Sequence, residues 1–171
     1  MSPCFFPQLG RLVSLVWFLR RWGLFLVFAS IFSLYYSARY KIIYNHGSSM
    51  EPTINNGSIF IVKKKHYDSI PIKRFDIVLV RDREGKEYIT KRIIALEGEK
   101  VEIIDGDIYV NDKLIKDRFF EVKIAFGENN TNEKSFVIPK NSVWVIGDNR
   151  AISHYGVYNI EDLRGRACLL F

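Results

Sequence analysis

The stretch DIVLVRDREGKEYITKRIIALEGEKVEII, residues 76–104, decides how the chain is expected to fold. It holds three short runs rich in β-branched residues, Asp76–Val80, Tyr88–Leu96 and Lys100–Ile104. Turn residues separate these runs, among them Gly85 in a charged segment. Because β-branched runs bounded by turn residues are typical of strands, the stretch predicts a series of strands joined by short turns.

The same pattern continues through most of the chain. Further strand candidates are Ser58–Val62, Ile108–Val110, Lys113–Ile115, Ser135–Ile138, Ser142–Ile146 and Arg164–Leu170. Asp105-Gly106 predicts a tight turn, and Asn111-Asp112 predicts the connection of a hairpin. Asn159–Leu163 predicts only a short turn of helix with Asn159 as its cap. We therefore expect a mostly β fold, with one mostly antiparallel β-sheet domain over residues 41–171.

The first 40 residues differ from the rest and predict a membrane anchor. From Trp22 to Ala38 the chain has 17 consecutive uncharged residues, at the short end of what a spanning helix needs. A cleaved signal peptide would need small residues where Tyr35-Tyr36-Ser37-Ala38-Arg39 stands. A buried core helix would show one apolar stripe, whereas this segment is apolar all round. We expect residues 1–40 to form an N-terminal tail and one transmembrane helix.

The distribution of charge indicates a membrane rather than a nucleic acid as the partner. The formal net charge is +6, yet all nineteen acidic residues lie at Glu51 or later. From Lys41 onward the charges nearly balance, so the folded domain lacks the basic surplus of a nucleic-acid binder. The arginines before the span place the N-terminus in the cytoplasm and the domain outside. Cys4 and Cys168 would then lie on opposite sides of the membrane, and their spacing indicates no metal site.

Four segments hold residues whose spacing indicates chemistry. They are His46–Thr53 with Ser49, Phe75–Val80, Tyr88–Glu99 with Lys91, and Val143–Ser153 with its Gly-Asp-Asn sequence. In this order, and after an anchor, the four segments resemble the sequence boxes of the type I signal peptidases. The resemblance spans residues 49–153. It implies a β-sheet domain of signal-peptidase type, with a small second β-subdomain between residues 96 and 143.

The resemblance also implies a role for each matching residue. Ser49 is expected to be the nucleophile and Lys91 the general base, with Ser153 orienting Lys91. The backbone of Gly47 is expected in the oxyanion hole, and no metal or cofactor is expected. The apolar residues after the nucleophile are expected to contact substrate or membrane, namely Met50, Pro52 and Ile54.

A lysine can serve as the base only if its amine is neutral near pH 7. A serine hydroxyl is a poor nucleophile until a base takes its proton, and the ordinary lysine pKa of about 10.4 is too high. Burial lowers the pKa of an amine, and alternation puts Lys91 on one side of its strand with Ile89, Ile93 and Ala95. A Ser-His-Asp triad is the alternative. Eukaryotic secretory relatives of the family carry histidine in the lysine's place, whereas this chain has Lys91.

The chain departs from the family pattern in two places. Gly47 stands where many members carry a serine whose hydroxyl helps to bind the oxyanion, so backbone N–H groups must bear more of that load. The segment after Ser153 runs directly into His154-Tyr155-Gly156, as if about four residues were missing, by comparison with the family. The charged residues that usually brace the lysine have no obvious match. These departures indicate a divergent member.

The expected function is signal peptidase I, a serine endopeptidase that removes signal peptides from exported preproteins through an acyl-enzyme. The expected partners are those preproteins and membrane lipid, with no nucleic acid. The expected location is the bacterial inner membrane, as a single-pass protein with its catalytic domain outside. Two alternatives stay open: a specialised maturation protease of a secretion or conjugation system, such as a pilin-processing enzyme, or an inactive peptide-binding relative.

Overall fold

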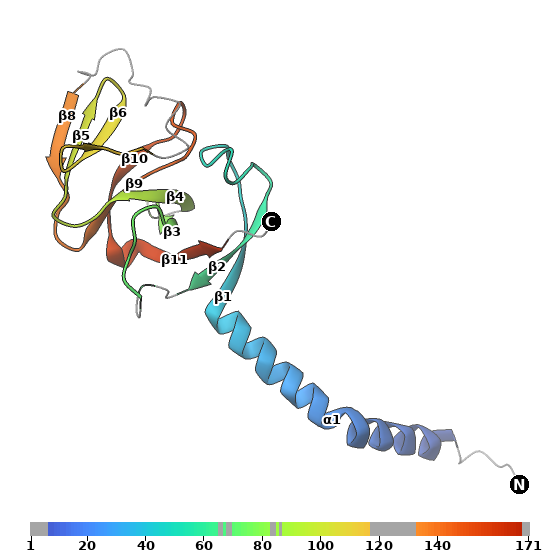
Figure 1. The fold of residues 1–171 in the computed structure, drawn as a ribbon. Coiled ribbons are helices and arrows are strands. Elements are labelled where there is room, and N and C mark those ends of the chain that lie inside the picture. The colour runs from blue at the N-terminus through green and yellow to red at the C-terminus, as the bar shows by residue number, and fades with distance from the viewer. Residues whose placement is uncertain are drawn as a thin grey trace, which may run out of the picture. The chain divides into compact units, whose positions relative to one another are not determined.

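The computed structural model describes residues 7–64, 67, 70–82, 85, 87–116 and 133–168 (Figure 1). The chain divides into two compact units, Met1–Arg39 and Tyr40–Phe171. The first unit ends one residue before the boundary expected from the sequence. It consists of helix α1, and the second unit consists of two antiparallel β-sheets.

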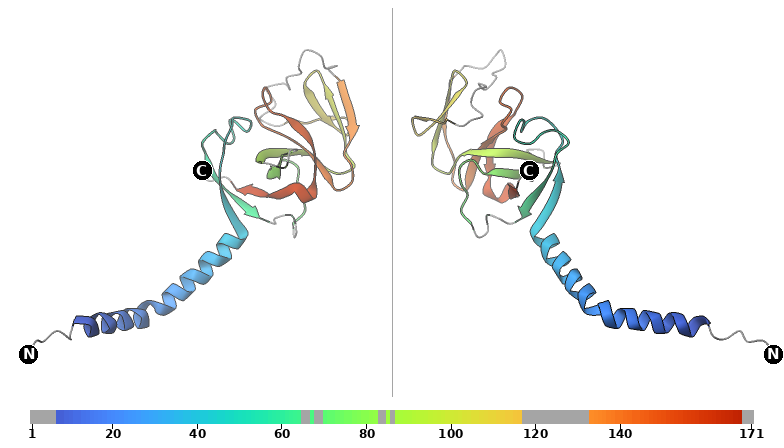
Figure 2. Two further views of the ribbon diagram at one scale, coloured as in Figure 1. Left: turned by 180° about the vertical axis from the view of Figure 1, so that it is seen from behind. Right: turned by 45° about the vertical axis from the view of Figure 1, so that its right-hand side comes forward.

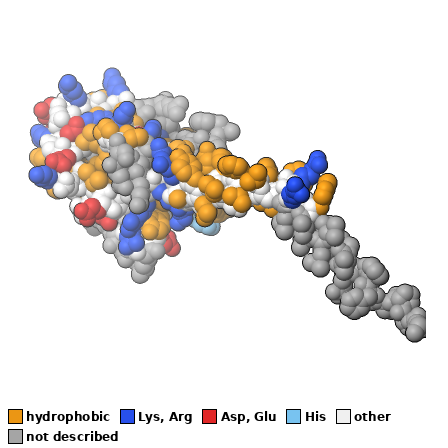
Figure 3. All heavy atoms as spheres, turned by 90° about the horizontal axis from the view of Figure 1, so that it is seen from below, with side chains coloured by type: hydrophobic (Ala, Val, Ile, Leu, Met, Phe, Trp, Pro, Cys, Tyr) orange, Lys and Arg blue, Asp and Glu red, His pale blue; other side chains and the backbone are white. Residues whose placement is uncertain are grey.

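Helix α1 runs from Pro7 to Arg39. Proline is tolerated in a first helical turn, and the cation of Arg39 is favourable at the negative C-terminal end. Exposed apolar side chains follow one another along its second half, as Figure 3 shows. The predicted transmembrane helix nevertheless finds no support here: in the part of the chain that the structure describes, no helix combines enough length and mean hydropathy to cross a bilayer.

The larger sheet has seven strands in the order β1-β2-β11-β3-β4-β9-β10, with every neighbouring pair antiparallel. Its strands are β1 Tyr40–Tyr44, β2 Ile59–Lys64, β3 Ile77–Arg81, β4 Tyr88–Ala95, β9 Ser142–Ile146, β10 Tyr155–Asn159 and β11 Leu163–Cys168. Every residue of β9 is buried, as are the last six of β4. Near-continuous apolar runs in the sequence therefore became the central strands, covered on both faces.

The smaller sheet has four strands in the order β7-β6-β5-β8. They are β5 Lys100–Ile104, β6 Asp107–Val110, β7 Lys113–Leu114 and β8 Glu133–Val137. Both predicted tight turns are present, and all four of their residues, Asp105-Gly106 and Asn111-Asp112, have positive φ. That geometry matches the right-handed twist of two-stranded hairpins. The small second β-subdomain is therefore confirmed.

A shared hydrophobic core joins the two sheets. Ile103 and Ile108 from the smaller sheet are fully buried in one cluster with Trp144 and Ile146 of β9. The smaller sheet lies beside the β9–β10 side of the larger one (Figures 1 and 2). Two further clusters fill the larger sheet, one centred on β2 and β3 and the other on β3, β4 and β9. Strand β9 thus connects the core of the smaller sheet with the site described below.

Two strands were not predicted from the sequence, and the predicted helical turn is shorter than expected. Tyr40–Tyr44 was not predicted as a strand, but β1 pairs with β2 along its whole length. Strand β10 was not predicted. The expected helical turn after it is a 3₁₀ turn over Ile160–Asp162, and Asn159 makes no side-chain cap there. The end of the predicted strand Arg164–Leu170 and the position of Cys4 lie outside the described residues.

Candidate active site

The loop between β1 and β2 carries Ser49, and its flanks are tied to one another. The side-chain amide of Asn45 donates to the carbonyl oxygens of Gly47 at 3.1 Å and Asn55 at 3.0 Å. The amide N–H of Gly57 donates to the carbonyl oxygen of Asn45 at 2.9 Å. These bonds close the loop across its base and leave Ser49 half-buried.

Two apolar residues after Ser49 anchor this loop in the core. Met50 and Ile54 are only 1% and 2% exposed, and they pack in the cluster centred on β2 and β3. The prediction that they contact membrane or substrate is wrong for this structure, because their side chains have almost no surface to offer. Pro52, the third residue of that prediction, is exposed, and its peptide bond to Glu51 is cis.

Strand β4 places Lys91 in the interior of the sheet. Its side chain is buried beside apolar neighbours, with Val78 directly opposite on β3 and Ile93 two residues along on the same face. Burial lowers the pKa of Lys91 to about 8, although the carboxylate of Asp148 opposes the shift. Desolvation thus outweighs the nearby negative charge, as expected for an amine that must lose its proton readily.

The hydroxyl of Ser153 holds the amine of Lys91. Lys91 Nζ donates to Ser153 Oγ at 2.8 Å, and the N–H of Gly147 donates to the same oxygen at 2.8 Å. Ser153 Oγ donates in turn to the carbonyl oxygen of His154 at 3.1 Å. A serine hydroxyl has one proton and two lone pairs, so this one is fully used. Lys91 must therefore be the donor in its bond to Ser153, and the lone pair of a neutral amine points elsewhere.

The loops of Ser49 and Ser153 meet at Gly147. A Cβ atom at this position would lie 2.1 Å from the carbonyl oxygen of Ser49 and 2.2 Å from Ser153 Oγ. Both distances are far below van der Waals contact, so only a glycine fits between the two loops. The backbone of Gly147 therefore brings the segments of Ser49, Ser153 and Lys91 together. The Gly147 contacts were not predicted, although the Gly-Asp-Asn sequence was the signal that could have indicated them.

The Asn149 residue joins the same two loops by hydrogen bonds. Its backbone N–H donates to the carbonyl oxygen of Ser49, and its side-chain amide donates to that of Ser48, both at 3.1 Å. Its own carbonyl oxygen accepts from the N–H of Ser153 at 3.0 Å.

A buried ion pair supports the other face of β4. Arg92 binds both carboxylate oxygens of Asp148 at 2.7 Å, and its guanidinium also donates to the carbonyl oxygen of Phe75 at 2.9 Å. The pair lies in the interior, because Asp148 is only 3% exposed. The sequence showed no obvious match for the charged residues that usually brace the lysine in the family. Arg92 directly follows Lys91 in the sequence, and this position could have indicated the ion pair.

The predicted oxyanion role of Gly47 conflicts with its hydrogen bonding. The N–H of Gly47 donates to Oδ1 of Asn56 at 3.0 Å and is therefore occupied. The N–H of Ser49, by contrast, makes no hydrogen bond to any of the residues the structure describes. Ser49 is thus the better source of a backbone donor for a developing negative charge.

Neither histidine near the two serines forms a triad. His46 is exposed and its ring packs edge-on against Tyr44, with 4.7 Å between the ring centroids. His154 is exposed and reaches the site only through its backbone carbonyl oxygen. Lys91 therefore remains the candidate base.

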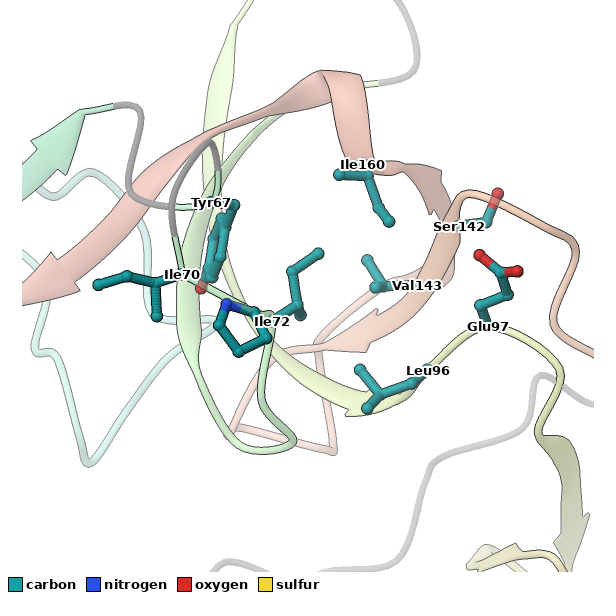
Figure 4. A pocket seen from close by; sticks show the side chains of 9 residues that line it. Tyr67, Ile70, Ile72, Leu96, Glu97, Ser142, Val143 and Ile160 are labelled. Carbon is teal, nitrogen blue, oxygen red and sulfur yellow. The ribbon is translucent and has the colours of Figure 1, made fainter.

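An apolar pocket of about 330 Å³ lies elsewhere in the second unit (Figure 4). Apolar side chains form most of its wall, with Glu97 and Ser142 at one side; the lining residues are Tyr67, Ile70, Pro71, Ile72, Leu96, Glu97, Ser142, Val143 and Ile160. Ser49, Lys91 and Ser153 do not line it, so it is separate from the site above. Among the described residues no cluster of three or more His, Cys, Asp and Glu side chains could hold a metal ion.

Comparisons with known proteins point in one direction. Residues 19–171 match the family described as "Signal peptidase, peptidase S26". A signal peptidase I from Streptococcus pneumoniae is 29% identical over 194 aligned positions, which cover 90% of this chain and 93% of that protein. One from Bacillus caldolyticus is 30% identical over 165 positions, covering 86% and 87%. The crystal structure of a signal peptidase I from Enterococcus faecalis is similar with a TM-score of 0.47 at 24% identity, over 57% of this chain and 97% of that one.

The burial of Lys91 predicts an unusual titration. In the folded protein Lys91 should lose its proton near pH 8, whereas an unfolded lysine keeps it to about pH 10.4. The unfolded chain then binds more protons between these values, so the free energy of unfolding should rise with pH across that window. Relative to Lys91→Met the rise should be on the order of 3 kcal/mol. NMR of labelled lysine side chains and urea unfolding from pH 7 to 10.5 would measure both effects; a Lys91 resonance that titrates above pH 10 would contradict them.

The close approach at Gly147 predicts that one added methyl group disrupts the site. Gly147→Ala should lower the free energy of unfolding by about 1–3 kcal/mol, because the backbone oxygen of Ser49 cannot easily move away. Gly23→Ala in α1 is the matched control: its new methyl group meets nothing within 4 Å, so it should be neutral or stabilising. Urea denaturation measures both variants, and a Gly147→Ala protein as stable as the parent would show that the loops are not tightly packed.

Proposed function

Because this chain belongs to the signal peptidase family, we propose that it is a serine endopeptidase that removes N-terminal signal peptides from exported preproteins, with Ser49 as nucleophile and Lys91 as base. One observation carries the assignment of residues: the buried amine of Lys91 is bound to Ser153, and the loops of Ser153 and Ser49 meet at Gly147. These contacts support a site in which a hydroxyl and an amine with a lowered pKa act together in a partly buried setting, as base-assisted acyl transfer requires.

The first step is attack on the substrate's peptide carbonyl. With a pKa of about 8, roughly one Lys91 in ten is neutral at pH 7. Its lone pair takes the proton of Ser49 Oγ while that oxygen forms a bond to the carbonyl carbon, and the carbonyl's π electrons move onto its oxygen. The Lys91 ammonium then gives a proton to the leaving nitrogen, the carbon–nitrogen bond breaks, and an ester on Ser49 remains.

The second step returns the enzyme to its starting state. The neutral Lys91 takes a proton from water, whose oxygen attacks the ester carbon, and Ser49 Oγ leaves with the proton that Lys91 gives back. In both steps the negative oxygen faces the backbone N–H of Ser49, which has no other partner among the described residues. Ser153 keeps the amine in place throughout, because its Oγ accepts a hydrogen bond from Lys91 Nζ. Its bonds with Gly147 and His154 fix the hydroxyl itself.

A lipid surface is the second proposed partner, through an apolar face of β1 and β2. Ile42, Tyr44 and Ile59 are 71%, 55% and 57% exposed, and strand register puts them on one side of the sheet. Lys63 lies on the same side, opposite Tyr40. This group of exposed residues replaces Met50 and Ile54 as the membrane contact within the domain. The single-pass topology and the location in the bacterial inner membrane, with the N-terminus in the cytoplasm, stay predictions.

The nucleophile assignment is tested with two neighbouring serines. Ser49→Ala should abolish cleavage of a preprotein with an A-x-A signal sequence, and Lys91→Ala should do the same, because each removes a group that the chemistry requires. The matched control, Ser48→Ala, keeps the backbone carbonyl that Asn149 binds and should retain most activity. Gel analysis of preprotein processing in detergent measures all three. Full activity in Ser49→Ala would reject the proposal, and no activity in the parent protein would favour the inactive, peptide-binding relative.

The lipid contact is tested on the full chain with vesicles of phosphatidylethanolamine and phosphatidylglycerol. Replacing both Ile42 and Ile59 by Ser should weaken vesicle binding roughly tenfold or more, since two apolar side chains leave the lipid. Val137→Ser is the control, because Val137 is 61% exposed on the smaller sheet. Flotation of protein with vesicles measures the partition. Equal losses in both proteins would mean that the face of β1 and β2 has no special part in binding.

A further inference from the structure

We infer that Asn149 is a positioning residue that aims the backbone N–H of Ser49 at the negative oxygen formed during catalysis. The inference rests on the proposed function of Ser49 and assigns a role to a residue that touches neither substrate nor base. Its basis is the pair of hydrogen bonds by which Asn149 holds the carbonyl oxygens of Ser48 and Ser49.

Because a peptide unit is planar, a hydrogen bond that fixes the direction of its C=O group also fixes the direction of its N–H group. A trans peptide is planar, and its C=O and N–H groups point in opposite directions. The carbonyl of Ser48 and the N–H of Ser49 belong to one such plane. When the Asn149 amide holds the oxygen of Ser48 at 3.1 Å, it also sets the direction of the Ser49 N–H, away from Asn149.

The second bond fixes the peptide plane on the other side of Ser49. The backbone N–H of Asn149 holds the carbonyl oxygen of Ser49 at 3.1 Å, so both planes that flank the Cα atom of Ser49 are restrained. The direction of its Cβ atom follows from those two planes. One residue therefore restrains both the hydroxyl that attacks and the N–H that receives the developing charge.

The bond from the side chain can be assigned without ambiguity. Its partner is a carbonyl oxygen, which can only accept, so the nitrogen of the Asn149 amide must face it. The oxygen of Ser48 also accepts from the N–H of Glu51 at 3.3 Å, a longer contact within the loop itself. Asn149 supplies the shorter bond, and it comes from outside the loop.

Asn149 also belongs to the turn that carries Ser153. Its carbonyl oxygen accepts from the N–H of Ser153 at 3.0 Å, so the orientation of the donor for the oxyanion and the position of the residue that holds Lys91 start from one place in the chain. A substitution at position 149 keeps these backbone bonds and removes only the side-chain bond to Ser48. The side chain can therefore be tested separately.

The experiment compares Asn149→Ala with the parent on a peptide substrate and on two inhibitors of the same sequence. A peptide aldehyde accepts Ser49 Oγ at its carbonyl carbon and develops the negative oxygen, whereas the matching peptide alcohol has no carbonyl there. We expect kcat to fall about 10- to 100-fold, somewhat less than the loss of a direct oxyanion donor, with KM changed less than threefold. The aldehyde should bind weaker by the same factor as kcat, and the alcohol should bind as before.

The matched control is Asn45→Ala, which removes the same kind of amide bond one peptide earlier, at the carbonyl of Gly47, together with the bond to the carbonyl of Asn55. This variant should lower Tm at least as much as Asn149→Ala but leave the ratio of aldehyde to alcohol affinity unchanged. If Asn149→Ala fails to fold, Asn149→Asp is measured instead, because it has the same shape and lacks the donor.

Two results would overturn the inference: a kcat within twofold of the parent, or equal losses of aldehyde and alcohol affinity. Failure of the proposed function looks different, since either Ser49→Ala would keep its activity or the parent protein would have none, whatever the result for Asn149. If Ser49→Ala is inactive and Asn149→Ala has the parent's kcat, only the role of Asn149 is rejected.

Discussion

The site depends on keeping one amine out of water. A buried ammonium is costly, and the fold meets that cost by letting Lys91 release its proton near neutral pH. The apolar side chains of β3, β4 and β9 around it exclude solvent, and they belong to the central core of the larger sheet. Below pH 8 the residue that we propose as the base therefore lowers the stability of the protein, because its buried amine is then charged.

One charged residue, Asp148, acts against the lowered pKa of Lys91 without reversing it. The carboxylate of Asp148 favours the protonated form of Lys91, but Arg92 binds both oxygens of that carboxylate and neutralises much of its field. A buried pair of this kind is weak support for stability in itself. The ion pair of Arg92 and Asp148 links β4 to the segment after β9, on the face of β4 opposite Lys91.

The sequence could predict the elements that depend on neighbouring residues, but not those that depend on contacts between distant segments. Lys100–Ile104 and Ser142–Ile146 were predicted with the same bounds that β5 and β9 have, because local β-branched runs define them. Strands β1 and β10 were missed, since each has exposed or half-buried tyrosines and depends on pairing with a distant or neighbouring strand. Motifs indicated Ser49, Lys91 and Ser153. The sequence signals at Gly147, Asn149 and Arg92 did not identify the partners of these residues, because each contact joins segments that only the tertiary fold brings together.

The hairpin of β9 and β10 positions Ser153 with only a short connecting segment between the two strands. Tyr155 pairs with Ile146 across the hairpin, so Gly147 and Ser153 leave the two strands at nearly the same level. Strand pairing brings the Ser153 hydroxyl close to the Gly147 N–H, and the packing of Trp144 against Tyr155 supports that pairing near the loop end of the hairpin. A short connecting segment has little conformational entropy to lose, so strand register sets the alignment of Gly147 with Ser153 at little cost.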